Sequence, residues 1–179
     1  MDIFTMIAQS IGVAAMILTI ISMQFRSNKN FFLCLEAGGL LFATSFFMIG
    51  AWGGAVMNVF GMIRPELLRH EKIAKSKYAL LFLVLLLAVC TLVVFLVSDE
   101  KWYFILMVAA AQLAGTVSMW FRDGKKIRLC QLFIISPLWL AYDALIPTPS
   151  IGGILTEIIN ICSVCLALYR FRKIGFTER

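Results

Sequence analysis

The chain has 179 residues, of which 61% are hydrophobic and 15% are charged, and its formal net charge is +6 at pH 7. Soluble globular domains contain about 45–50% apolar and about 25% charged residues, so this composition excludes an ordinary water-soluble domain. The few charged residues fall in clusters, and the clusters divide the sequence into long apolar runs.

These runs have the length of membrane-spanning helices, which need about 20 residues, with about 17–25 tolerated. We predict seven such helices, over residues 3–24, 31–49, 51–68, 78–98, 102–121, 129–145 and 150–169. Helices are favoured over a β-barrel because the runs are continuously apolar rather than alternating. The third run is the weakest of the seven, since Arg64 and Pro65 fall in its last turns.

Lys and Arg are distributed unequally about these runs. With seven spans, the connections after spans one, three and five and the C-terminal tail share one side, and they hold two, five, four and four cations. Only Lys101 lies on the other side. Because cytoplasmic loops carry the excess of positive charge, we predict an outer N-terminus and an inner C-terminus in a bacterial inner (plasma) membrane. Contact with anionic lipids explains the net charge, and no nucleic-acid partner is expected.

The sequence also contains an internal repeat. Ser22–Arg26 recurs as Ser118–Arg122 at an offset of 96 residues, and Gly53-Gly54 recurs as Gly152-Gly153 at an offset of 99. A three-span unit ends on the side opposite to its start, so a second copy in the same orientation needs one additional crossing. The fourth run supplies that crossing.

The repeat therefore predicts an all-α polytopic membrane protein with a 3+1+3 plan, two parallel three-helix bundles joined by a linker helix. Its parts are residues 1–70 as the first bundle, 71–101 as a basic inner loop and linker helix, and 102–179 as the second bundle and basic tail. Parallel repeats of this kind are a transporter architecture, with the site between the halves near the membrane midplane.

Polar residues inside the runs are candidates for function, because burying them in a membrane is unfavourable. Gly54, Asn58 and Gly61 share one helical face of the third run, and Glu157 and Asn160 occupy the seventh. Asn58 and Glu157 are equivalent at the offset of 99. Two interpretations are open: the pair contacts a solute between the bundles, or it only holds the bundles together.

The sixth run contains a second group of candidates. Trp139 and Asp143 are four residues apart on one face, near the outer end. They are interpreted either as a stacking wall and polar gate or as residues of the interfacial aromatic belt. Pro137 favours a kink that is either a hinge or a fixed bend, and Ser45 in the second run is a weaker candidate for solute contact.

No catalytic chemistry is predicted. The five cysteines lie in apolar runs, where free cysteine behaves as a small buried hydrophobe. The sequence contains no P-loop, HExxH or GxSxG motif. We therefore expect no enzyme activity, no catalytic residue, no metal and no cofactor.

Several of these features together resemble the YgjV-type bacterial inner membrane proteins, over nearly the whole chain. They are Gly50-Ala51-Trp52-Gly53-Gly54 with Asn58, Gly61 and Arg64, and Ser136–Asp143 with Ser150–Gly153 and Glu157. That family is similar in plan to the SWEET, SemiSWEET and PQ-loop transporters. The resemblance implies that each bundle packs its spans in the order one, three, two, and that Asn58 and Glu157 contact the substrate on a central path.

The chain also departs from these relatives. It has no Pro-Gln dipeptide, and Ser45 and Asp143 stand where a histidine and an asparagine are usual in the YgjV-type family. The resemblance therefore does not imply a sugar as the substrate.

The sequence as a whole predicts a transporter or facilitator of a small polar solute, which alternates access between two pseudo-symmetric bundles. One alternative is a vitamin-precursor permease in which Trp139 stacks on an aromatic base. The other is a non-transporting membrane scaffold in which the glycine stripes serve packing only. The expected partners are the solute and membrane lipids, with a homo-oligomer as a further option.

Overall fold

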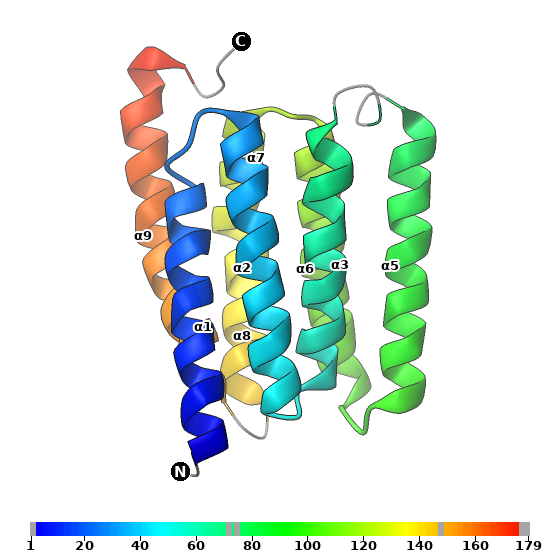
Figure 1. Cartoon of the computed structure of the whole chain (residues 1–179). Helices are drawn as coiled ribbons and strands as arrows, with labels where there is room; N and C mark the ends of the chain where they lie inside the picture. Colours follow the sequence, from blue (N-terminus) through cyan, green and yellow to red (C-terminus); the bar gives the residue numbers. More distant parts are fainter. Residues whose placement is uncertain (1–2, 71–72, 74–75, 147–148, 176–179) are drawn as a thin grey trace.

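The computed structural model describes residues 3–70, 73, 76–146 and 149–175, and within these ranges all regular structure is helical. The helices are α1 (Ile3–Ser22), α2 (Asn28–Met48), α3 (Trp52–Arg69), α5 (Lys77–Val97), α6 (Trp102–Trp120), α7 (Gly124–Cys130), the π-helix η1 (Gln131–Ile135), α8 (Ser136–Leu145) and α9 (Ile151–Ile174). They run side by side, with the start of α1 and the end of α9 at opposite ends (Figure 1). This agrees with the predicted all-α fold.

Five helices within the described ranges are long and apolar enough to cross a membrane: α1, α2, α5, α6 and α9. The third and sixth predicted spans are not among these five helices, and a different physical reason explains each exclusion. Helix α3 holds Arg64, Glu66 and Arg69 within its 18 residues. The sixth span is divided into α7, η1 and α8, because a π-helical turn precedes Pro137.

The six columns formed by α1, α2, α3, α6, α7–η1–α8 and α9 make a closed ring. Neighbours in contact around it are α1 with α2, α2 with α3, α3 with α6, α6 with α8, α8 with α9, and α9 with α1. Helix α5 lies outside this ring and packs on α3 and α6. Its outward side chains are large and apolar, as expected of a lipid-facing helix, and include Leu81, Phe82, Leu85, Val89 and Leu92.

The packing order of the first three helices differs from the order one, three, two that the resemblance implied. Helix α2 lies between α1 and α3 and contacts both. Two adjacent glycines make this possible: a Cβ at Gly38 would meet the Thr19 hydroxyl of α1 at 2.9 Å, and one at Gly39 would meet backbone atoms of α3 at 3.4 Å. Because only residues 49–51 connect α2 to α3, those helices must be neighbours.

The ring closes through α1 and α9, whose backbones approach at a pair of glycines. A Cβ added to Gly152 would lie 3.1 Å from the carbonyl carbon of Gly12 and 3.3 Å from its Cα. Small residues that permit such backbone contact are typical of helix interfaces in membranes. On the other side of the ring, Gly61 of α3 faces the side chain of Gln112 of α6, whose nitrogen would lie 3.4 Å from a Cβ added to the glycine.

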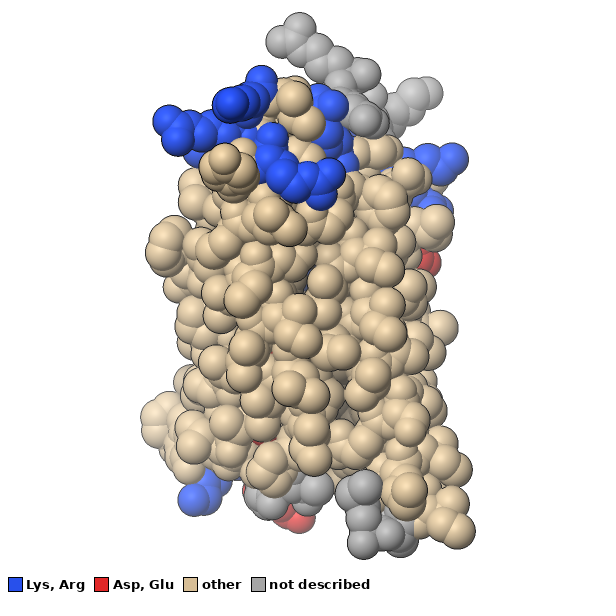
Figure 2. Space-filling view, turned by 90° about the vertical axis from the view of Figure 1, so that its left-hand side faces the viewer, with Lys and Arg blue, Asp and Glu red and all other residues tan. Residues whose placement is uncertain are grey.

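Charged residues separate along the helix axes. Lys and Arg gather at one end of the face shown in Figure 2, and the broad middle is almost uncharged. We call this the cation-rich end, where α1, α3, α6 and α9 finish, and the other the cation-poor end. Lys101 lies at the cation-poor end, in the connection from α5 to α6. Lys72, Lys75 and Arg179, also counted among the clustered cations, lie outside the described residues.

Two arginines counted as loop cations are instead buried. The side chain of Arg64 lies inside the ring, and that of Arg128 donates to the backbone carbonyls of Met23, Phe25 and Gly124 at 2.9 Å each. Arg128 thereby joins α7 to the connection between α1 and α2. Both guanidinium groups donate hydrogen bonds to oxygen atoms of the protein.

The glycine contact between α1 and α9 generates a first prediction. Replacing Gly152 by Val forces the two backbones apart, since no flexible side chain there can move aside, and should destabilise the protein by about 1–3 kcal/mol. The unfolding temperature of the purified protein in detergent, followed by tryptophan fluorescence, measures the effect. Ala14→Val, on the exposed side of α1, should leave that temperature unchanged. Equal effects of the two substitutions would contradict the close contact.

Candidate functional site

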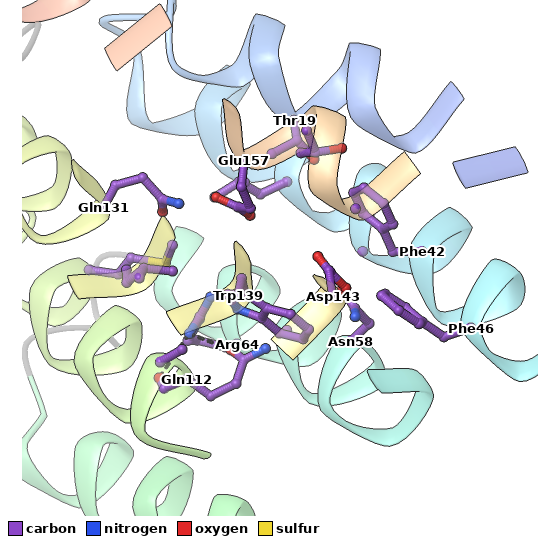
Figure 3. A pocket seen from close by; sticks show the side chains of 18 residues that line it. Thr19, Phe42, Phe46, Asn58, Arg64, Gln112, Gln131, Trp139, Asp143 and Glu157 are labelled. Carbon is purple, nitrogen blue, oxygen red and sulfur yellow. Dashed lines mark hydrogen bonds between the residues drawn. The ribbon is translucent and has the colours of Figure 1, made fainter. Parts of the chain in front are cut away.

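The ring of helices encloses a central cavity with about 100 Å³ of space for the centres of water-sized molecules. All six columns contribute to its wall, and α5 does not. The polar and charged lining residues converge from different helices in Figure 3; they are Thr19, Asn58, Arg64, Gln112, Gln131, Asp143, Thr156 and Glu157. Phe42, Phe46 and Trp139 add an aromatic wall.

Asn58 and Glu157 both line this cavity, from α3 and α9 respectively. The repeat predicted them at equal depth, and both lie six residues into their helices, about 9 Å from the cation-poor end by the helical rise. Asn58 donates its amide to the carbonyl oxygen of Gly54 at 2.8 Å. Glu157 is buried, and its Oε2 has no hydrogen-bond partner among the described residues.

Arg64 reaches the cavity six residues beyond Asn58 along α3. Its Nη1 donates to the side-chain oxygen of Gln112 at 2.9 Å and to the backbone oxygen of the same residue at 3.0 Å. Gln112 in turn donates to the carbonyl of Met57 at 2.8 Å. The guanidinium occupies the space that a side chain at Gly115 would fill. The glycine in α6 therefore makes room for a buried cation.

Asp143 approaches the cavity from α8, beside Trp139. Its carboxylate occupies the place of a Cβ at Gly153, so the second glycine pair of the repeat serves to admit an acidic side chain. The backbone oxygen of Asp143 accepts a hydrogen bond from Ser150 N–H at 3.1 Å, but its side-chain Oδ1 has no partner among the described residues. Asp143 and Glu157 thus place two acids on the cavity wall.

At the cation-poor end, a hydrogen-bonded group joins α3 to α8. Gly54 N–H donates to the Tyr142 hydroxyl at 2.8 Å, Tyr142 donates to Glu100 at 3.2 Å, and Gly53 N–H donates to Glu100 at 2.8 Å. The first turn of a helix has free N–H groups and favours an anion, so Glu100 is well placed there. Tyr142 also packs against Phe46 and Trp139.

At the cation-rich end, side chains join α1 to α9. Gln24 donates to the Ser163 hydroxyl at 2.8 Å and to the backbone oxygen of Ser163 at 3.0 Å, and it accepts from Arg170 at 2.7 Å. Arg26 donates to the carbonyl oxygens of Ile174 and Gly175. Polar contacts between the two repeats therefore lie at both ends of the cavity.

Four of the six predicted solute contacts line the cavity together: Asn58, Trp139, Asp143 and Glu157. The structure places the other two elsewhere. Ser45 donates to the carbonyl of Ala8 at 2.8 Å, within the interface of α1 and α2. Asn160 is fully buried one turn beyond Glu157 and does not line the cavity. Its side-chain amide has no hydrogen-bond partner in the described part of the chain. The predicted hinge, Pro137, directly follows η1 and Ser136.

Sequence reasoning missed five polar residues of the cavity wall: Thr19, Arg64, Gln112, Gln131 and Thr156. The charge count placed Arg64 with the cations that follow the third run, although it continues the stripe of Asn58 and Gly61 at steps of three and could have been found from that spacing. Gln112 was not among the predicted solute contacts. Gln131 lies in η1 and donates to Ser136 at 3.0 Å, and no pattern in the sequence distinguished it.

The cavity is equipped to bind a solute and to contact it with charges of both signs. No cluster of three or more metal-ligating side chains occurs in the residues that the structure describes. The described cysteines are all free and none lines the cavity. Hydrogen bonding, ion pairing and aromatic stacking are the interactions that this wall offers.

The family model Imp-YgjV, described as a bacterial inner membrane protein, matches residues 6–174. The comparisons with curated proteins and with solved structures found no match.

The hydrogen bonds of Tyr142 generate a second prediction. Tyr142→Phe keeps the ring but leaves the buried N–H of Gly54 without its acceptor, which should destabilise the protein by about 1–3 kcal/mol. Thermal unfolding in detergent measures the loss. The matched control is Tyr103→Phe, since Tyr103 is exposed on α6 and should tolerate the change. A Tyr142→Phe protein as stable as the native one would argue against this contact.

Proposed function

Since the chain belongs to the Imp-YgjV family of bacterial inner membrane proteins, we propose that it transports, or facilitates the passage of, a small polar solute across that membrane. The observation that carries the proposal is the central cavity, because all six columns of the ring line it. Ionisable side chains at membrane depth are expensive and typically mark a solute pathway. The cavity contains three of them, Arg64, Asp143 and Glu157.

The proposed topology has seven crossings, with the N-terminus outside and the C-terminus inside. Helix α3 and the column α7–η1–α8 run alongside the five most apolar helices (Figure 1), which supports counting them as crossings. The concentration of Lys and Arg at one end supports a cytoplasmic position for that end. In this arrangement the two three-helix units are parallel and α5 is the linker helix.

In the proposed mechanism the cavity opens alternately to each side as residues 1–70 and 102–179 move relative to each other. Opening toward the cation-poor end would break the hydrogen bond from Gly54 to Tyr142 and the hydrogen bond from Tyr142 to Glu100. Opening toward the cation-rich end would break the bonds from Gln24 to Ser163. The bond from Gly54 to Tyr142 and the bonds from Gln24 to Ser163 join the first repeat to the second, as alternating access requires.

A vitamin-precursor permease remains the second candidate, and one observation favours it. The indole of Trp139 lines the cavity and packs 6.2 Å from the Phe46 ring, centroid to centroid, so an aromatic base could stack there. Quenching of Trp139 fluorescence by such a compound, but not by non-aromatic solutes, would distinguish this candidate. A scaffold without transport is the outcome if no solute binds or crosses.

The topology leads to a labelling prediction. In a cysteine-free background, a cysteine at Lys101 should react with a membrane-impermeant maleimide added to intact spheroplasts. A cysteine at Lys126, in the first turn of α7, should react only after the membrane is opened. The reverse pattern would show that the orientation is inverted, and labelling of both positions from outside would contradict the number of crossings.

The transport proposal leads to a flux prediction. Purified protein in liposomes should accelerate the uptake of at least one compound among sugars, nucleosides, vitamins and amino acids. The double variant Asn58→Leu, Glu157→Leu removes polar contacts from equivalent positions of both repeats and should reduce uptake to the rate of protein-free liposomes. The double control Thr44→Leu, Thr91→Leu changes polar residues outside the cavity and should retain uptake. Flux that survives the first double variant would refute the site.

A further inference from the structure

The wall of the cavity carries buried charges of both signs. Arg64, Asp143 and Glu157 line it, and they are only 8%, 2% and 8% exposed. Within the described part of the chain, Arg64 forms no ion pair with either acid; the ion pairs found there involve Glu66. A buried charge without a partner of opposite charge is unfavourable, so a solute that carries the opposite charge would stabilise each of these side chains in its charged form.

Each of the three side chains also has an unused hydrogen-bonding atom. Arg64 Nε, Asp143 Oδ1 and Glu157 Oε2 are buried and have no hydrogen-bond partner among the described residues. Buried polar atoms are nearly always hydrogen-bonded. Gln112 fixes the position of the guanidinium through two bonds to Nη1 and leaves Nε free for another acceptor.

The charges are separated along the cavity. Asn58 and Glu157 lie at equal depth, and Arg64 lies six residues beyond Asn58, about 9 Å nearer the cation-rich end. Asp143 packs on Gly153, about one turn from Glu157 toward the cation-poor end. In Figure 3 Glu157 and Arg64 lie on different sides of the open space, with Trp139 between Arg64 and Asp143. The cavity therefore has a positive and a negative part.

We infer that the cavity binds a small zwitterion, a compound with one carboxylate and one ammonium group such as an amino acid or a betaine. The carboxylate pairs with Arg64, and the ammonium lies beside Asp143 and Glu157 near the face of Trp139, where a cation–π contact adds to the attraction. This inference rests on the proposed function, because it names the class of solute that the same cavity takes.

Other classes of solute fit the wall less well. An uncharged sugar would leave all three charged groups without a counter-charge. A simple anion would satisfy Arg64 and add repulsion with the acids, while a simple amine would leave Arg64 unpaired. Only a solute with both charges pairs with both parts of the cavity.

The test compares matched solutes on the native full-length protein in lipid nanodiscs. The set is L-alanine with both charges, isopropylamine with the ammonium alone, propionate with the carboxylate alone, and glucose with neither; the other common L-amino acids and glycine betaine extend the first class. A bound solute raises the unfolding temperature by mass action. We expect this rise for at least one zwitterion and for none of the other three compounds at the same concentration.

Variants then assign the two ends of the solute. Arg64→Gln and Glu157→Gln should each weaken binding of the zwitterion at least about tenfold, since each removes one charge-assisted contact. Arg128→Gln and Asp123→Asn are the matched controls, a buried arginine and a carboxylate outside the cavity, and should bind as the native protein does. Arg64→Lys keeps the charge and should bind better than Arg64→Gln.

The outcomes separate this inference from the proposed function. If the amine or propionate stabilises the protein as much as the zwitterion, or if Arg64→Gln binds normally, the zwitterion assignment is wrong. If glucose or another uncharged solute binds and crosses liposomes, the assignment is wrong and transport stands. If no solute in the set binds and no flux occurs, both the zwitterion assignment and the proposed function are wrong. The solute comparison needs only the native chain, so it tests the zwitterion assignment even if the Arg64→Gln variant does not fold.

Discussion

A polar group within the hydrocarbon of a membrane can find partners only in the protein itself, and this constraint organises the whole molecule. It turns the Leu, Val and Phe side chains of α5 toward lipid and collects the charged side chains inside a ring of helices. Arg64 can be buried because Gln112 accepts its hydrogen bonds and Gly115 leaves it space. Where the ring encloses more polar groups than it can pair, a cavity with unused donors and acceptors results.

Much of this arrangement was predictable, and the exceptions have physical causes. The offset of 99 residues placed Asn58 and Glu157 at equal depth, because depth along a helix follows directly from residue number. The packing order was wrong, since it came from a resemblance, whereas Gly38 and Gly39 let α2 pack on both neighbours. The sequence prediction counted Arg64 with the cations at the end of the third run, because a charge near the end of an apolar run normally marks the membrane surface. Its burial depends on Gly115, on another helix.

Equivalent positions of the two repeats serve different purposes. The glycine pair of α3 faces Glu100 and Phe46, whereas the pair of α9 faces the backbone of Gly12 and the carboxylate of Asp143. The same two small residues therefore admit an acid or an aromatic ring in one repeat, and a backbone or an acid in the other. In both repeats the glycine pair leaves space for groups from neighbouring helices, but the chemistry of those groups differs. The wall of the cavity can therefore carry different charges along its length.

Helix α5 lies against only one of the two junctions at which the first three helices meet the later ones. It packs on both α3 and α6, whereas the junction of α1 and α9 has no such covering helix within the described residues and is held by the glycine contact and the bonds of Gln24 and Arg26. The two junctions are therefore mechanically unequal. In the proposed mechanism, relative rotation of the two units would have its axis near α5, and lateral separation would be greatest where α1 and α9 face the lipid. Lipid thickness and lateral pressure would then act most strongly on that side.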